Sequence, residues 1–233
     1  KDYLINFLTR PFLLDTNVYI LFLLCFIPIY ANDFEEEIIP QNDWVIRVNA
    51  GSAFPNRVGT GESSWYSNLD ESSCGFQYGV DLIHYNKCIG YGFTFKHYMH
   101  NLPYIENQGL SIDEKTRILY VAPQFSNIDE DFLFKGMVSN IDLGIGYAHY
   151  LSDGIINASQ NYSAPCSGLG INLNLGLEYK FNVNWGVKIS ISGEYYHFKD
   201  IHKGNEYSVE TFDKRSKLNM LMVIPQIGIS VHL

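Results

Sequence analysis

Eight charged residues occur in segments of this sequence where polar and apolar residues alternate, and charges in that setting suit either ion chemistry or buried salt bridges. Asp142, for example, lies between Ile141 and Leu143. A set of this kind could line a polar channel or hold a proton or an ion. We favour a closed, salt-bridged network, because a buried charge that is only partly paired is costly. Four of the eight are acidic and four are basic: Arg47, Asp81, Lys96, Asp142, Glu178, Lys180, Lys188 and Glu194.

An aromatic pair is a separate candidate for binding. Trp65 and Tyr66 lie in the polar segment ESSWYSNLDESS, which covers Glu62–Ser73. Exposed aromatic residues are frequent at binding hot spots, but they equally suit the aromatic belt of a membrane protein. The sequence leaves these two interpretations open.

The sequence indicates no cofactor or metal site. Besides Cys25, which lies in an apolar run near the start, the chain contains Cys74, Cys88 and Cys166, and their spacing matches no metal motif. Three is an odd number, so we expect at least one of them to stay unpaired. The net charge of −9 and the lack of a basic run argue against nucleic-acid binding.

The beginning of the chain has the features of an export signal. Val18–Tyr30, VYILFLLCFIPIY, is too short to span a bilayer as a helix, which needs roughly 20 residues. It has the length of the apolar part of a signal peptide, and Ala31 provides a small residue for cleavage. We therefore expect residues 1–31 to be a cleaved signal and 32–42 a polar lead-in. Because the chain begins with Lys rather than Met, we expect its start to be truncated or wrongly chosen.

Residues 43–233 are dominated by an alternation with a period of two, which predicts β-strands with one apolar and one polar face. From Leu169 to Phe181, every odd position is Leu, Ile, Tyr or Phe, and every even one is Gly, Asn, Glu or Lys. Pro123 and Pro225 fall inside predicted strands, where we expect bulges or strand ends. Eight strands are predicted: Asp43–Phe54, Ser73–Tyr85, Cys88–His100, Lys115–Ser126, Phe132–Leu151, Cys166–Phe181, Trp185–Lys199 and Lys217–Leu233.

The connections between these segments alternate in length. Short turns join the second segment to the third, the fourth to the fifth and the sixth to the seventh, as in hairpins. The other connections, near 55–72, 101–114, 152–165 and 200–216, are long and polar. An even number of strands with every long loop at one end is typical of a small outer-membrane barrel, whose tight turns face the periplasm.

The composition of the two faces predicts which of them meets lipid. The polar faces contain many glycines, which suit the narrow interior of an eight-stranded barrel. A solvent-exposed face would instead be rich in long charged residues. The apolar faces carry aromatic residues near strand ends, as an interfacial belt requires: Trp44, Tyr179, Phe181 and Trp185. We therefore predict that the apolar faces point outward to lipid.

The chain from Asp43 to Leu233 resembles the small bacterial outer-membrane β-barrel proteins, the broad group that includes the OmpX-type and OmpA-type barrels. The strand pattern, the loop order and the final strand IPQIGISVHL carry this resemblance. It implies an all-β fold, an eight-stranded antiparallel up-and-down transmembrane β-barrel in the bacterial outer membrane. Final strands in this group commonly end in an aromatic residue that the insertion machinery recognises, whereas this chain ends in Leu233.

Some eight-stranded barrels modify lipid A, and this activity is the enzymatic alternative. The lipid A deacylases carry a His-x-Ser-Asn element, in which the histidine activates a serine nucleophile. The nearest segment here is KHYMHN, Lys96–Asn101, where Met99 takes the serine position after His97 and His100 takes the asparagine position. Without a nucleophile, this segment predicts no catalytic residue.

We therefore expect a non-enzymatic integral outer-membrane barrel with four long extracellular loops and a closed interior, acting in envelope integrity or surface interaction. The expected partners are outer-membrane lipid and lipopolysaccharide, the barrel-insertion machinery and an extracellular partner that the sequence does not identify. A soluble exported lipocalin-like barrel that binds an apolar ligand is the other alternative, and its apolar faces would line the cavity.

Overall fold

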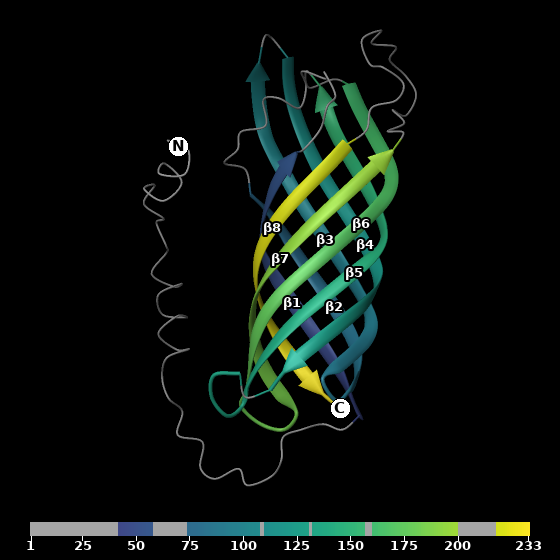
Figure 1. Cartoon of the computed structure of the whole chain (residues 1–233). Helices are drawn as coiled ribbons and strands as arrows, with labels where there is room; N and C mark the ends of the chain where they lie inside the picture. The colour runs from purple at the N-terminus through teal and green to yellow at the C-terminus, as the bar shows by residue number, and fades with distance from the viewer. Residues whose placement is uncertain (1–41, 58–73, 108–109, 131, 157–159, 200–217) are drawn as a thin grey trace, which may run out of the picture. The chain divides into compact units, whose positions relative to one another are not determined.

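The computed structural model describes residues 42–57, 74–107, 110–130, 132–156, 160–199 and 218–233. Eight strands run through these residues, each antiparallel to the next, and β1 pairs with β8, so that the sheet closes into a barrel (Figure 1). The predicted fold is confirmed. The strands are β1 (Asn42–Arg57), β2 (Gly75–Asn86), β3 (Ile89–Asn107), β4 (Leu110–Asp129), β5 (Met137–Ile156), β6 (Gln160–Lys180), β7 (Trp185–Lys199) and β8 (Leu218–His232).

No helix in the described part of the chain is long and apolar enough to cross a membrane. Residues 1–41, which include the predicted signal peptide, lie outside the described residues.

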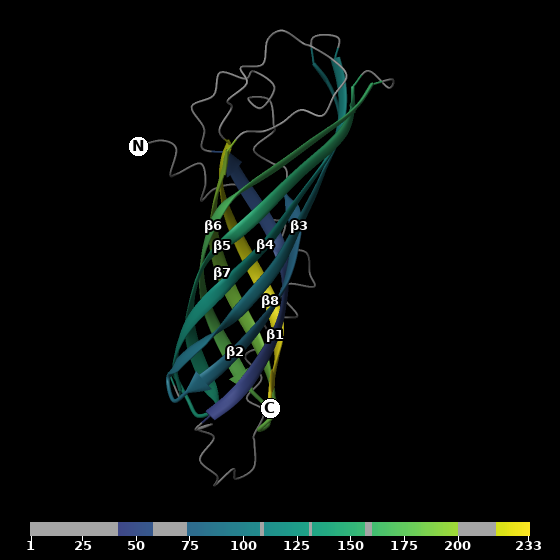
Figure 2. The ribbon, with the colours of Figure 1, turned by 90° about the vertical axis from the view of Figure 1, so that its right-hand side faces the viewer.

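Strands β3, β4 and β6 are longer than predicted, whereas β5 has the predicted length but begins and ends five residues later. These four strands contain 19 to 21 residues, whereas β1, β2, β7 and β8 contain 12 to 16. The connections predicted as loops near 101–114 and 152–165 are therefore mostly paired strands, which extend past the rest of the barrel at one end (Figure 2). In the opposite direction, residues 132–136 were predicted to begin a strand but form a turn.

Both prolines inside the predicted strands lie where the ladder to one neighbour is interrupted. Pro123 pairs with Phe93 of β3, but the ladder from β4 to β5 skips it. Pro225 pairs with Ile191 of β7, and the ladder from β8 to β1 skips it. The missing N–H of proline accounts for these gaps. The prediction of bulges or strand ends is wrong at both sites, because the strands continue and pairing resumes in the same register.

Apolar side chains face outward over the barrel wall, and polar ones face inward. Phe93 and Ile191 are 63 % and 58 % exposed, whereas the inward-facing Asp142 and Glu194 are fully buried. On β1 the outward apolar residues extend from Trp44 to Phe54. The ten steps between these two residues, each rising about 3.3 Å at a tilt of about 45°, give a height of about 23 Å, which is close to that of the apolar band of a membrane barrel. The barrel is therefore a membrane-spanning barrel of the outer-membrane type, and the lipocalin-like alternative is excluded.

Both edges of the outer apolar band carry residues that suit a membrane interface. At the end with the short turns, Trp44 packs on His84 with ring centroids 4.9 Å apart, and His84 contacts Tyr91 at 5.3 Å. Toward the opposite end the outward face becomes polar, and Arg117 pairs there with Asp153 while both side chains stay partly exposed. Aromatic rings at one boundary and exposed charges at the other fit the transition from hydrocarbon to water.

Gly146 lies where β4 and β5 approach too closely for a side chain. A Cβ atom at this position would lie 2.2 Å from the carbonyl oxygen of Val121 and 2.5 Å from the Cα of Ala122. We expect Gly146→Ala to lower the free energy of unfolding by about 1–3 kcal/mol, because the two strands must move apart. Urea unfolding in lipid vesicles, followed by tryptophan fluorescence, measures this loss.

Gly193→Ala is the matched control for this prediction. The nearest atom to a Cβ at position 193 is the carbonyl oxygen of Leu173 at 3.9 Å. We expect a change within about 0.5 kcal/mol for this variant. An equal loss of stability in both variants would contradict the role of close strand approach.

Candidate functional site

The eight charged residues predicted for the interior all lie inside the barrel, where none is more than 7 % exposed. They come from β1, β2, β3, β5, β6 and β7. Seven of them take part in ion pairs: Arg47, Lys96, Asp142, Glu178, Lys180, Lys188 and Glu194. Asp81 is held instead by hydrogen bonds, from the Asn49 side chain at 2.9 Å and from the Thr94 hydroxyl at 2.6 Å.

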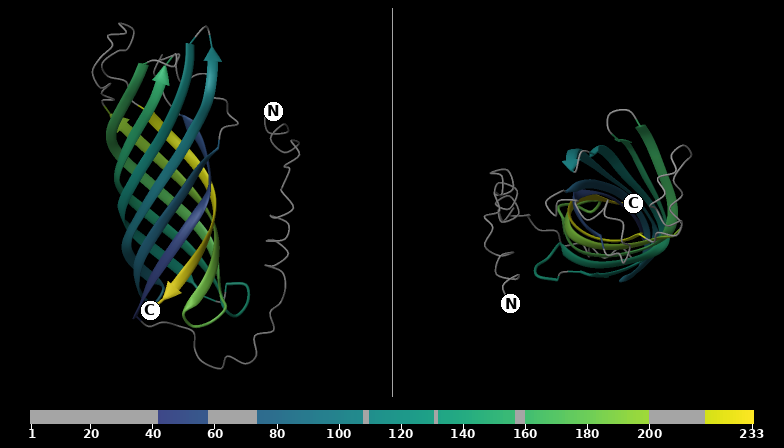
Figure 3. Two further views of the ribbon diagram at one scale, coloured as in Figure 1. Left: turned by 180° about the vertical axis from the view of Figure 1, so that it is seen from behind. Right: turned by 90° about the horizontal axis from the view of Figure 1, so that it is seen from above.

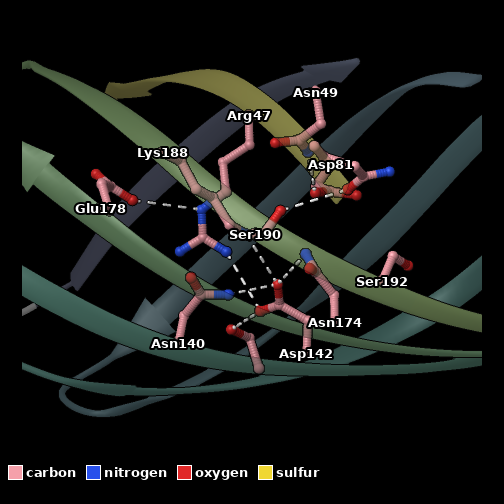
Figure 4. Close-up of polar contacts among 12 residues, drawn as sticks. Arg47, Asn49, Asp81, Asn140, Asp142, Asn174, Glu178, Lys188, Ser190 and Ser192 are labelled. Carbon is pink, nitrogen blue, oxygen red and sulfur yellow. Dashed lines mark hydrogen bonds and ion pairs between the residues drawn. The ribbon is translucent and has the colours of Figure 1, made fainter. Parts of the chain in front are cut away.

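Asp142 of β5 is the centre of the larger network (Figure 4). Its carboxylate accepts from the Arg47 guanidinium at 3.3 Å and from the Lys188 ammonium at 3.2 Å. Because both cations lie on other strands, this one carboxylate ties β1 and β7 to β5. Three uncharged side chains also donate to it, namely Ser126 at 2.5 Å, Asn140 at 2.6 Å and Asn174 at 3.2 Å.

Arg47 connects Asp142 to the rest of this network. Its Nη2 donates to the Tyr85 hydroxyl at 2.7 Å, and Tyr85 in turn contacts Ser126 at 2.6 Å, which closes a ring of hydrogen bonds back to Asp142. On its other side, the Arg47 Nε lies 3.7 Å from Glu178. Glu178 is held in addition by Ser230 and His232, each at 2.6 Å.

A second network surrounds Glu194 of β7. Its carboxylate pairs with the Lys96 ammonium at 2.7 Å and accepts from Gln77 at 2.7 Å and from the Tyr196 hydroxyl at 2.6 Å. A separate ion pair joins Lys180 to Glu130, at 3.4 Å, near the short-turn end of the barrel. Hydrogen bonds to charged groups are the strong ones, so these contacts offset much of the cost of burying the charges.

A cluster of aromatic and sulfur-containing side chains fills another part of the interior. Tyr196 contacts Tyr120 and Phe198 with ring centroids 5.6 and 5.9 Å apart, and Phe198 contacts Tyr150 at 5.4 Å. Met220 and Met222 belong to the same cluster. These residues were not predicted from the sequence, although they share the inward parity of their strands and that parity could have identified them.

This arrangement can hold the barrel closed. Charged, aromatic and aliphatic side chains all occupy an interior that, in an eight-stranded barrel, is just wide enough for side chains to fill. No group of three or more potential metal ligands occurs among the described residues. The chemistry of the interior is therefore pairing of opposite charges within the protein.

The two histidines of the segment compared with the deacylase element lie on opposite faces of β3. His97 faces outward and contacts the Tyr78 hydroxyl at 2.9 Å, whereas His100 is buried on the inward face. His149 lies 3.2 Å from Ser167 on the outer face, and no carboxylate of the described residues pairs with its ring.

Trp65 and Tyr66, the predicted binding aromatics, lie outside the described residues. Cys74 and Cys88 are exposed and Cys166 is buried, and none of these three described cysteines forms a disulfide.

Comparison with solved structures supports the fold. No protein-family model matches this sequence, and no curated protein sequence matches it significantly. The structure is similar to that of a major outer membrane protein from Thermus thermophilus, with a TM-score of 0.54 and 10 % identity over 83 % of this chain and 100 % of the other. Neisserial surface protein A matches with a TM-score of 0.49 and 8 % identity over 81 % of this chain and 96 % of the other.

Proposed function

We propose that this chain is a non-enzymatic structural barrel of the bacterial outer membrane, with a closed interior that conducts no ions. One observation carries the proposal: seven of the eight buried charges take part in ion pairs and Asp81 is hydrogen-bonded, while the outer wall is apolar. A channel would need a continuous water-filled path through the interior. Here the carboxylates of Asp142 and Glu194 are instead surrounded by donors from the barrel itself.

The long strands β3 to β6 support a role at the cell surface. With the short turns in the periplasm, these strands would extend outward beyond the membrane. Paired strands present a stiffer surface than irregular loops, because their backbone groups already bond to one another. We propose that this extension contacts a partner outside the cell or contributes to the integrity of the envelope.

Planar-bilayer recording tests the closed interior. We expect the refolded protein to show no large and stable conductance, because its interior is filled by paired side chains. Folding is verified on the same sample by the change in gel mobility on boiling, and a porin added afterwards shows that the bilayer can report a pore. A reproducible open level from the folded protein alone would overturn the proposal.

A further inference from the structure

The turn between β4 and β5 exposes three large apolar side chains in a row. Phe132, Leu133 and Phe134 are 50 %, 66 % and 54 % exposed. By contrast, the turn between β2 and β3 is formed by Lys87 and Cys88 and contains no large apolar side chain. Clustered apolar exposure of this kind marks a surface that meets either lipid or another molecule.

Backbone hydrogen bonds hold this turn in a defined conformation. The Met137 N–H donates to the Phe134 carbonyl at 3.0 Å, and the Phe132 N–H donates to the Met137 carbonyl at 3.0 Å. Gly136 adopts a φ of 87°, as the third residue of a type II turn requires. The three apolar side chains therefore project from an ordered loop.

One acidic residue of the turn, Glu130, contacts the interior of the barrel. Glu130 is only partly exposed and pairs with Lys180, whose side chain lies inside the barrel. Figures 1 and 3 show the backbone of the turn standing out sideways from the barrel, at the end that carries the short turns. The turn therefore reaches beyond the closed ring of strands at this end.

The apolar surface of the turn is continuous with the outer apolar wall. Phe134 contacts Tyr179 of β6, with ring centroids 6.2 Å apart. Phe181 and Trp185, near the adjacent strand ends, are 46 % and 45 % exposed. The same kind of surface thus extends from the lipid-facing wall onto Phe132–Phe134.

We propose that Phe132, Leu133 and Phe134 insert into the periplasmic leaflet of the outer membrane, with phospholipid as the molecule that covers them. This inference rests on the proposed membrane location and adds to it a lipid anchor outside the barrel wall. Apolar side chains held at the boundary between headgroups and acyl chains bind a membrane in proportion to the area they bury.

Spin labelling in vesicles of phosphatidylethanolamine and phosphatidylglycerol tests this anchor. A nitroxide is attached at Leu133→Cys, and its collisions with oxygen, which concentrates in lipid, are compared with those with a water-soluble nickel complex. Ile141→Cys, outward-facing on β5 and 53 % exposed, is the lipid control, and Asn86→Cys is the aqueous control. The native cysteines are first replaced by alanine, and folding is checked by the mobility shift on boiling.

We expect the ratio of oxygen to nickel collisions at Leu133 to match that at Ile141 and to exceed that at Asn86 several-fold. A ratio at Leu133 equal to that at Asn86, or a label protected from both reagents by a second protein copy, would overturn the anchor. The membrane location would stand in that case if Ile141 still reports lipid. If Ile141 itself reports water, the proposed function fails.

Discussion

Asp142→Asn is expected to lower the free energy of unfolding by about 3–5 kcal/mol, because it removes the negative charge that two buried cations share. Lys188 pairs with Asp142 at 3.2 Å, and Arg47 keeps Glu178 at 3.7 Å as its remaining carboxylate partner. Asparagine preserves the shape of the side chain, so the change isolates the loss of charge. Urea unfolding in lipid vesicles, followed by tryptophan fluorescence, gives the difference from the unmodified protein.

Asp153→Asn is the matched control. Asp153 also belongs to a cross-strand ion pair, with Arg117, but the two side chains are 36 % and 48 % exposed. Exposed pairs contribute little, so we expect a loss below about 1 kcal/mol here. If Asp142→Asn cost no more than Asp153→Asn, water would have to reach the buried cations, and the closed interior would be contradicted.

Phe198→Ala is expected to lower the free energy of unfolding by about 3–5 kcal/mol. Phe198 is fully buried and packs between Tyr150 and Tyr196, with ring centroids 5.4 and 5.9 Å away. Removal of the ring loses the favourable free energy of transferring it out of water, and it also leaves a cavity among the neighbouring side chains. The same urea titration measures the total.

Phe93→Ala separates these two contributions. Phe93 faces lipid and is 63 % exposed, so its removal loses a transfer free energy of about 1.5–3 kcal/mol but leaves a space that acyl chains fill. We expect the loss for Phe198→Ala to exceed that for Phe93→Ala by at least about 1 kcal/mol. Equal losses would mean that the interior around Phe198 rearranges as freely as lipid does.

The architecture was predictable because successive residues of a membrane β-strand alternate between an apolar face toward lipid and a polar face toward the interior. Gly168 to Phe181 changes character at every position, and the structure turns its odd positions outward and its even positions inward. The charges at Asp142 and Glu178 could be assigned to the interior for the same reason. Their pairing could not, because the partners lie on strands far apart in the sequence, and register decides which of them meet.

The aromatic cluster could not be recognised in the sequence, because on β7 aromatic residues occupy both the outward and the inward face. Tyr195 faces outward and Tyr196 inward, so the alternation between them disappears from the sequence. The extended pairs at the ends of β3 to β6 were missed for a related reason. Polar residues near 101–114 and 152–165 suggest a loop in water, but a strand that projects beyond the membrane has water on its surface too.

The pairing of β1 with β8 also determines the order in which the barrel can assemble. Seven of the pairings join strands that follow one another along the chain, so each can form from a local hairpin, whereas Val45 and His232 meet from opposite ends of the barrel sequence. Closing so long a loop carries the largest entropic cost of any contact in the sheet. We therefore expect the seam between β1 and β8 to be the last contact to form, and a chain whose synthesis stops before β8 to remain an open sheet with two unpaired edges.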